Sequence, residues 1–160
     1  MGEKKVEIRR VTGGPDLDAF RDMAREYAVW LNVDLCFQDF DAEMAGLPGK
    51  YAEPAGCILV AAVDGVPAGC VALAPLQANA VCEMKRLWVR PGNRGLGLGR
   101  KLAVSIMEAG AAAGYREMRL DTLPHLQTAI AIYRDLGFNE ISAYYHNPLD
   151  GVLYMGRSLP

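Results

Sequence analysis

The stretch that decides the fold reads Arg94-Gly95-Leu96-Gly97-Leu98-Gly99-Arg100-Lys101, between an apolar run typical of a strand and a run typical of a helix. Its three alternate glycines leave the backbone without side chains where the chain passes from strand to helix. Backbone amides at a helix N-terminus carry about half a positive charge from the helix dipole, so they attract anions. The stretch therefore predicts a phosphate-binding turn.

The charges near this turn lead to the same prediction. Residues 85–101 contain six basic side chains and no acidic one, although the 160-residue chain has a net charge of −2. The basic residues are Lys85, Arg86, Arg90, Arg94, Arg100 and Lys101. A phosphate-bearing ligand fits this part of the chain. The acidic overall balance argues against a nucleic-acid partner, because such binding requires a basic face.

Apolar periodicity on both sides of the turn predicts the other elements. Strands are expected at residues 6–11, 57–63, 66–76, 81–89, 118–122, 138–145 and 152–155, and helices at 16–31, 40–47, 98–113 and 126–136. The order β-α-α-β-β-β-α-β-α-β-β mixes hairpins with crossover helices. We predict an α+β (mixed α/β) fold with a central, mostly antiparallel sheet flanked by helices. Residues 1–160 are expected to form a single domain.

Composition sets the class and the compartment that we expect. The chain is 51% apolar and 22% charged, which is typical of a globular protein. No apolar run reaches the roughly 18 residues of a membrane span, and the N-terminus lacks a signal-peptide pattern. We therefore expect a cytoplasmic protein with no membrane partner. The four cysteines are widely spaced and the two histidines add no ligand cluster, so no metal site is predicted.

Other glycine-rich motifs fit the turn less well. A P-loop requires Gly-x4-Gly-Lys-Ser/Thr and a dinucleotide-binding fold requires Gly-x-Gly-x-x-Gly, and neither spacing occurs here. An S-adenosylmethionine methyltransferase could use Gly-x-Gly-x-Gly with Asp121 on the ribose. However, only about sixty residues follow the turn, too few for the further strand–helix units of that fold. The glycines could also serve only to let a helix pack closely on a strand.

The neighbours of the glycines favour a fourth interpretation. Arg94-x-x-Gly97-x-Gly99, after the strand at 83–89 and the turn at Pro91, resembles the Gln/Arg-x-x-Gly-x-Gly/Ala pyrophosphate loop of the GNAT superfamily of N-acetyltransferases. The order of elements is also similar to that of the family from end to end. The resemblance therefore covers the whole domain. It implies acetyl-coenzyme A (acetyl-CoA) as the co-substrate and an amine as the acetyl acceptor.

A second segment carries the same resemblance. Ala129-x-x-x-Tyr133-x-x-x-Gly137-Phe138 is similar to the penultimate helix of the family and the strand that follows it. The chain departs from the family at Leu126, where many members have an asparagine that contacts the pantetheine arm or the backbone. We therefore expect that contact to be absent or to come from another residue.

The resemblance implies a set of coenzyme-binding residues. The pantetheine arm would lie along the backbone of the strand at Leu87, Trp88 and Val89, and one of these amides would polarise the thioester carbonyl. The pyrophosphate would be bound by Arg94, Gly95, Leu96, Gly97, Leu98, Gly99 and Arg100.

Acetyl transfer also requires a base for the amine and an acid for the departing thiolate. An amine with a pKa near 10.4 is neutral in only about 1 molecule in 2,500 at pH 7. The resemblance implies Glu83, eleven residues before Arg94, as the base, acting through a water molecule or from an apolar pocket. It implies Tyr133 as the acid. Alternatively, Glu83 only pairs with Lys85 on a strand face shared with Leu87, and Tyr133 is a packed aromatic residue.

The acceptor would lie between the first two helices and the last two strands. Candidate acceptor-binding residues are Phe37, Gln38, Tyr144 and Tyr145, which combine aromatic rings with few polar groups, as small-ligand pockets do. We predict a small-molecule amine or an amino acid as the acceptor. A peptide or protein N-terminus is an alternative, as is a non-catalytic acyl-CoA-binding sensor or assembly module. A homodimer is left open.

Overall fold

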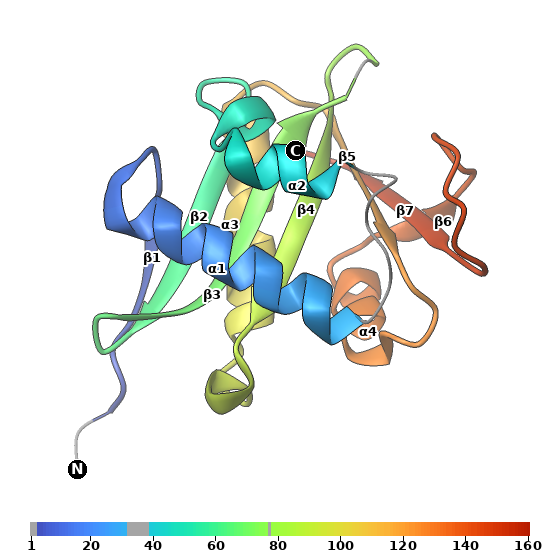
Figure 1. Cartoon of the computed structure of the whole chain (residues 1–160). Coiled ribbons are helices and arrows are strands. Elements are labelled where there is room, and N and C mark those ends of the chain that lie inside the picture. Colours follow the sequence, from blue (N-terminus) through green and yellow to red (C-terminus); the bar gives the residue numbers. More distant parts are fainter. Residues whose placement is uncertain (1–2, 32–38, 77) are drawn as a thin grey trace.

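The computed structural model describes residues 3–31, 39–76 and 78–160. Within these ranges, seven strands form one sheet in the order β1-β2-β3-β4-β5-β7-β6 (Figure 1). The strands are β1 (Val6–Arg10), β2 (Cys57–Val63), β3 (Val66–Pro75), β4 (Val81–Val89), β5 (Glu117–Thr122), β6 (Asn139–Ile141) and β7 (Leu153–Ser158). Neighbouring strands are antiparallel except β4 and β5, which are parallel. The predicted mixed, mostly antiparallel sheet is confirmed.

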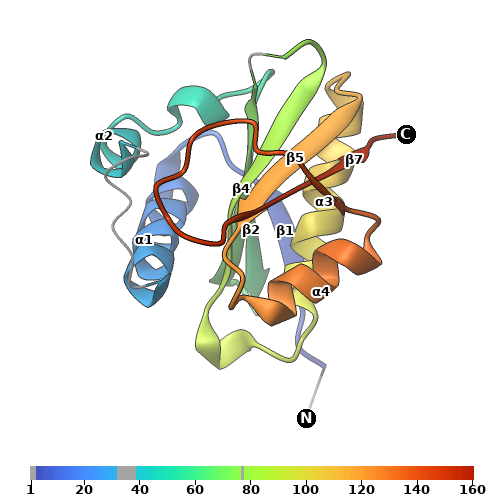
Figure 2. The same cartoon turned by 90° about the vertical axis from the view of Figure 1, so that its right-hand side faces the viewer.

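Helices cover both faces of the sheet (Figures 1 and 2). They are α1 (Gly14–Leu31), α2 (Phe40–Ala45), α3 (Leu98–Ala112) and α4 (Gln127–Asp135), with single 3-10 turns η2 (Gly49–Tyr51) and η3 (Pro91–Asn93). Helices α1 and α2 lie on one face, and α3 and α4 lie on the other. The predicted order of strands and α-helices is confirmed. None of these described helices combines the length and the apolar character that a membrane crossing needs.

The core has two parts, one on each face. On the α3 face, Leu102 and Ile106 pack against the sheet, and on the α1 face Phe20 and Met23 do so. All seven residues of β2 are buried, which explains why its sequence is continuously apolar rather than alternating. The three described cysteines are buried free thiols, as expected for small apolar side chains in strands.

Strand β4 contains a bulge that shapes the end of the sheet. Ala72 of β3 pairs with Lys85, and Cys70 pairs with Trp88, so β4 accommodates one extra residue between these two pairs. Arg86, inside the bulge, has a φ of 61°, in the left-handed region. Such an insertion reverses the alternation of side chains along the strand.

The bulge corrects one sequence-based expectation. Leu87 was expected to share a strand face with Glu83 and Lys85. That expectation is wrong, because Leu87 packs against the α3-face cluster together with Met84, whereas Trp88 belongs to the α1-face cluster. Residues 87–89, after the bulge, are therefore out of phase with those before it.

The predicted strand at 138–145 is also too long. Strand β6 ends at Ile141, and the segment at 142–152 leaves the sheet and crosses in front of β4 and β5 towards the α1 side (Figure 2). It does so because Tyr144 and Tyr145 turn inwards and donate hydrogen bonds to carboxylates on β4 and β5. Aromatic residues with high strand propensity are used here to bind carboxylates rather than to extend a ladder.

Candidate active site

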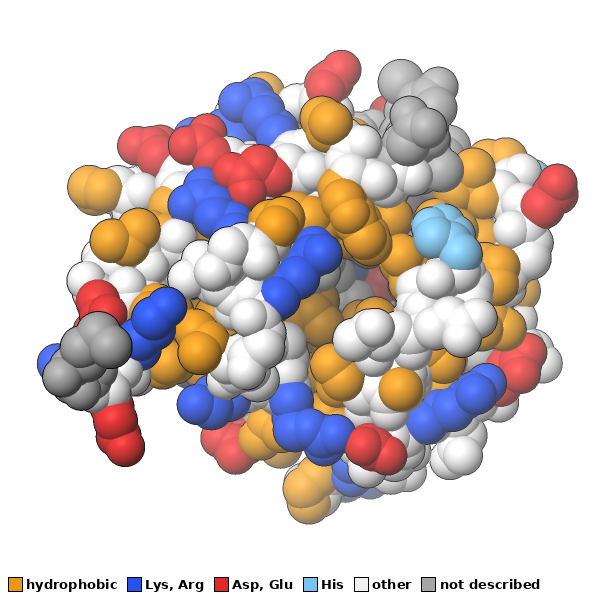
Figure 3. Space-filling model, turned by 90° about the horizontal axis from the view of Figure 1, so that it is seen from below, with side chains coloured by type: hydrophobic (Ala, Val, Ile, Leu, Met, Phe, Trp, Pro, Cys, Tyr) orange, Lys and Arg blue, Asp and Glu red, His pale blue; other side chains and the backbone are white. Residues whose placement is uncertain are grey.

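A cavity of about 650 Å³ lies where β4 separates from β5. The β4–β5 ladder stops at the pair Glu83–Arg119, and beyond it the two strands form the walls. The glycine turn, the first residues of α3 and α4, and the end of α1 complete the lining. Figure 3 shows this end of the molecule hollowed near its centre, with basic side chains around it.

Nine of the ten residues expected to bind the coenzyme line this cavity. They are Leu87, Trp88, Val89, Arg94, Gly95, Gly97, Leu98, Gly99 and Arg100. The tenth, Leu96, is partly buried and packs against the α3-face core cluster instead. Leu126, the departure from the family pattern, also lines the cavity.

The backbone of the glycine turn has the conformation that an anion site requires. Gly95 has a φ of 90° and Gly97 a φ of 73°, values that non-glycine residues adopt at a cost. A Cβ atom added to either would meet nothing within 4 Å, so close packing does not explain these two glycines. Gly97 is the N-cap of α3 and no side chain caps the helix, so its first amides are left for a ligand. The residues therefore fit a pyrophosphate.

Gly99 has a different role from its two neighbours. A Cβ atom there would lie 3.6 Å from Ile132 Cδ1 and 4.0 Å from Val89 Cγ2, both ordinary van der Waals distances. A methyl group would therefore fit at Gly99, which differs from Gly95 and Gly97 in facing α4 and β4 at contact distance.

Two arginines stand beside the turn. The guanidinium of Arg94 lies over the rings of Trp30 and Trp88, 5.4 Å and 5.1 Å from their centroids. Arg100 pairs with Asp135 at 2.7 Å, and both side chains are exposed. Each arginine is thus positioned by a neighbour at the edge of the cavity.

Tyr133 lines the cavity from α4 and is 7% exposed. Its ring packs edge-on against Phe138 with the centroids 5.9 Å apart. Among the described residues, none forms a hydrogen bond with the Tyr133 hydroxyl. Every fully buried polar side-chain atom of the described residues has a hydrogen-bond partner. The unpartnered hydroxyl is therefore not fully buried, and it reaches the cavity. Burial raises the pKa of the phenol well above its ordinary value, so it carries its proton at neutral pH.

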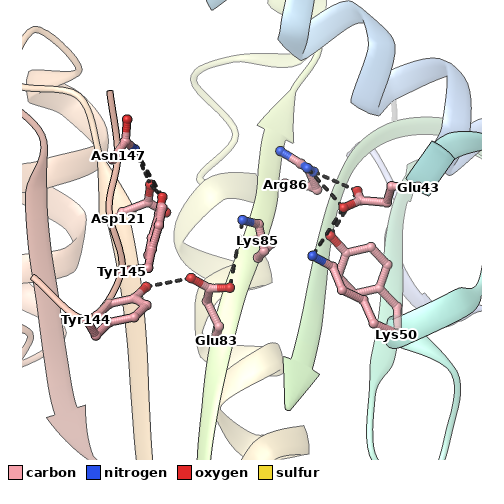
Figure 4. A network of polar contacts seen from close by, with 10 residues as sticks. Glu43, Lys50, Glu83, Lys85, Arg86, Asp121, Tyr144, Tyr145 and Asn147 are labelled. Atoms are coloured by element: carbon pink, nitrogen blue, oxygen red, sulfur yellow. Dashed lines mark hydrogen bonds and ion pairs between the residues drawn. The ribbon is translucent and has the colours of Figure 1, made fainter. Parts of the chain in front are cut away.

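Glu83 does not line the cavity. It is buried on β4, where its Oε2 atom accepts a hydrogen bond of 2.6 Å from the Tyr144 hydroxyl. Its Oε1 atom lies 3.8 Å from Nζ of Lys85, which is itself a cavity residue. Figure 4 shows Glu83 between these two partners. Tyr144 and Tyr145, expected to contact the acceptor, do not line the cavity but hold the carboxylates next to it.

A second carboxylate does reach the cavity. Asp121, near the end of β5, is a lining residue, and its Oδ2 atom accepts hydrogen bonds from the Tyr145 hydroxyl and from Asn147 Nδ2 (Figure 4). From the sequence, Asp121 was considered only as a ribose ligand in the methyltransferase alternative. A charged residue within the short apolar run at 118–122 was the signal that could have identified it.

Two buried cations follow Glu83 on β4. Burial lowers the pKa of Lys85, and the charge of Glu83 partly opposes this effect. The Arg86 guanidinium donates to both carboxylate oxygens of Glu43 in α2, at 3.0 Å and 3.1 Å. Although burial works in the opposite direction, Arg86 holds the pKa of Glu43 below its ordinary value. From the sequence, both cations were expected only as part of a basic stretch, with Lys85 also a possible partner of Glu83.

The sequence also predicted two further acceptor contacts and the absence of a metal site. Phe37 and Gln38, expected to contact the acceptor, lie outside the described residues. Among the described ranges, no group of histidine, cysteine, aspartate and glutamate side chains could hold a metal ion.

Comparison with known proteins identifies the class to which this fold and cavity belong. Residues 17–138 match the model of the acetyltransferase (GNAT) family. The chain belongs to this family and is an acyltransferase. The match includes β4, the glycine turn and α4, the elements that form the walls of the cavity.

Relatives with similar sequences carry the same family name. The chain is 42% identical over 156 residues to an uncharacterized N-acetyltransferase of Schizosaccharomyces pombe, which covers 97% of this chain and 96% of that protein. It is 32% identical over 123 residues to YjgM, an uncharacterized N-acetyltransferase of Escherichia coli, covering 76% and 72% of the two chains.

Solved structures confirm the fold. An acetyltransferase of the GNAT family from Staphylococcus aureus superposes with a TM-score of 0.76 at 18% identity, covering 96% of this chain and 100% of that one. The yncA protein of Salmonella typhimurium, whose structure contains acetyl-CoA, superposes with a TM-score of 0.74 at 20% identity, covering 97% and 94%.

Proposed function

We propose that this chain transfers an acetyl group from acetyl-CoA directly to the primary amine of a small molecule or amino acid. One observation carries the proposal. A single cavity joins uncapped helix amides at Gly97 to a protonated phenol at Tyr133 and a carboxylate at Asp121. An anion site, an acid and a polar acceptor region are the parts that acetyl transfer from a phosphate-bearing thioester needs.

The coenzyme would bind along one continuous stretch. The backbone amides between Gly95 and Gly99 would hold the pyrophosphate, each charge-assisted hydrogen bond contributing about 1.5–3 kcal/mol. The pantetheine arm would follow the backbone of Leu87 and Val89 beyond the β4 bulge. The acetyl-CoA found in the yncA structure, which shares this fold, supports the assignment.

The transfer moves one proton at each end of the reaction. The amine nitrogen attacks the thioester carbonyl carbon, the C–N bond forms and the C–S bond breaks. Tyr133 donates its proton to the departing thiolate and regains one from solvent, because its raised pKa favours the protonated phenol. Glu83 receives the proton of the amine through a water molecule, because it lies behind the cavity wall, and the proton then passes to solvent.

The small size of the acceptor is supported by two observations. The segment at 142–152 crosses the separation of β4 and β5 (Figure 2), which limits the space for a folded protein acceptor. N-acetylaspartate synthetase of Homo sapiens, whose name states an amino-acid product, is 30% identical over 111 residues, covering 69% of this chain and 37% of that protein.

Two measurements test the proposal together. A thermal-shift titration compares acetyl-CoA, coenzyme A, S-adenosylmethionine and NADH, because a ligand of the native state raises the melting temperature. Free-thiol release from acetyl-CoA is then followed with a panel of amines. We expect stabilisation by the first two ligands only and amine-dependent thiol release. Stabilisation without thiol release would support the sensor or assembly module instead, and stabilisation by NADH or S-adenosylmethionine alone would overturn the proposal.

A further inference from the structure

Two oppositely charged side chains face each other across the separation of β4 and β5. The ladder ends at the pair Glu83–Arg119, and two residues further along each strand stand Lys85 and Asp121. Both line the cavity. Two strands that diverge at this point thus bring one cation and one anion to the same space.

The ammonium of Lys85 is buried without a hydrogen bond. Its side chain is 9% exposed, and its nearest carboxylate oxygen, Oε1 of Glu83, is 3.8 Å away, beyond hydrogen-bonding distance. No other described residue accepts from it. Because no fully buried polar atom of the described residues lacks a partner, the ammonium reaches the cavity. Its N–H donors are therefore directed at a ligand or at water.

Asp121 shows the complementary arrangement. Tyr145 and Asn147 both donate to its Oδ2 atom, and no described residue donates to Oδ1. No salt bridge links Asp121 to a cation in the described part of the chain, Lys85 included. The protein thus holds the Oδ2 atom of Asp121 in place and leaves the Oδ1 atom available to a ligand.

We propose that the acceptor is an amino acid whose amine binds Asp121 and whose carboxylate binds Lys85. The inference rests on the proposed function and names the substrate class of the same cavity. A simple amine would satisfy Asp121 but leave the Lys85 ammonium with only water and the Glu83 carboxylate at 3.8 Å, beyond hydrogen-bonding distance. A free carboxylate beside the amine satisfies it with charge-assisted hydrogen bonds. The Lys85–Asp121 pair is thus a site for both charges of an amino acid.

The first test needs only the wild-type protein. Each common L-amino acid is offered beside its carboxamide and beside the corresponding decarboxylated amine, and thiol release from acetyl-CoA gives kcat/KM for each. We expect at least one free amino acid to exceed its carboxamide and its decarboxylated amine by tenfold or more. The carboxamide is nearly the same size, so the difference isolates the carboxylate charge.

The second test assigns the two residues. Lys85→Met keeps the length of the side chain and removes its charge. It should raise KM for the preferred amino acid at least tenfold and leave KM for the carboxamide within threefold. Lys4→Met removes an exposed lysine that does not line the cavity, and should change neither value. Asp121→Asn should lower kcat/KM for both compounds. Acetyl-CoA-dependent thermal shifts check that each variant folds.

The outcomes separate this inference from the proposed function. If the wild type acetylates none of the amines although acetyl-CoA binds, the proposed function fails. If it acetylates carboxamides or decarboxylated amines as well as free amino acids, the acceptor assignment alone is overturned. Equal effects of Lys85→Met on acid and carboxamide would also overturn it. Should Lys85→Met not fold, the wild-type comparison and Lys85→Gln decide the question.

Discussion

The two ends of the cavity are built in different ways. One end, where we propose that the coenzyme binds, is lined by one continuous stretch, 87–100, and would act mainly through backbone groups whose conformation is set by the β4 bulge and by Gly95 and Gly97. The other end, where we propose that the acceptor binds, is lined by polar side chains, among them Lys85 of β4, Asp121 of β5 and Asn147. Tyr144 and Tyr145 support it from behind through hydrogen bonds to the carboxylates of Glu83 and Asp121 (Figure 4). A backbone site should tolerate neutral substitutions but no added charge, whereas a side-chain site should respond to the loss of one polar atom.

The largest effect is expected from a charge placed in the coenzyme end. Gly97→Asp puts a carboxylate in front of the α3 amides, where it occupies the anion site and repels a phosphate. We expect the Kd for acetyl-CoA to rise at least 100-fold, measured by thermal-shift titration or calorimetry.

Gly97→Asn is the matched control for that prediction. Asparagine has nearly the same shape as aspartate and, like it, adopts the left-handed conformation more readily than most residues. It should weaken binding less than tenfold. Equal losses in the two variants would show that side-chain bulk or backbone strain, rather than charge, decides binding at this turn.

A smaller effect is expected where the two ends meet. Tyr133→Phe keeps the ring that packs on Phe138 and removes the hydroxyl that reaches the cavity. We expect turnover to fall tenfold or more while the Kd for acetyl-CoA changes less than twofold. Unchanged turnover would remove Tyr133 from the mechanism and leave it as a packing residue.

The pH dependence sharpens the same prediction. Since burial raises the pKa of Tyr133, the hydroxyl remains the protonated acid well above pH 8. At saturating acceptor, the wild-type kcat should therefore rise with pH as the acceptor amine loses its proton, with no fall caused by Tyr133 up to pH 10. A falling limb in the wild type between pH 8 and 10 that is absent in Tyr133→Phe would keep Tyr133 as the acid but contradict the raised pKa.

The difference between the ends also explains what the sequence could predict. Nine of the ten residues that the sequence assigned to coenzyme binding line one cavity, because its glycines and its strand are adjacent in the chain; that they bind the coenzyme stays a prediction. Leu96 is the exception, since one position in a turn can point to the core while its neighbours line a cavity. The strand order was predictable for the same reason, as it depends on local periodicity.

The acceptor end could not be predicted in this way. Asp121 and Lys85 are 36 residues apart in the sequence, and only the divergence of β4 and β5 brings them to one space. The bulge at Arg86 shifts the alternation on which strand-face predictions depend. Tyr144 and Tyr145 continue the strand pattern of the sequence. In the structure they leave the sheet because they donate hydrogen bonds to Glu83 of β4 and Asp121 of β5.

The smallest effect is expected from one hydrogen bond that supports the acceptor end. Tyr144→Phe removes the donor to Oε2 of the buried Glu83 and leaves that carboxylate with Lys85 at 3.8 Å. Losing a hydrogen bond to a buried charged group costs about 1.5–3 kcal/mol. We expect a melting temperature several degrees lower and an acceptor KM raised about three- to tenfold, with the Kd for acetyl-CoA unchanged.

Tyr115→Phe is the matched control, because it also removes one tyrosine hydroxyl that donates a hydrogen bond. The Tyr115 hydroxyl donates to the neutral carbonyl oxygen of Ala55 at 2.7 Å, at an exposed site away from the cavity. A hydrogen bond between neutral groups contributes only about 0.5–1.5 kcal/mol, so this variant should lose less stability and keep its acceptor KM. If both variants shifted the melting temperature equally and neither changed KM, the segment at 142–152 would contribute to stability but not to acceptor binding. The acceptor would then be positioned by β4 and β5 alone, without help from the tyrosines that brace their carboxylates.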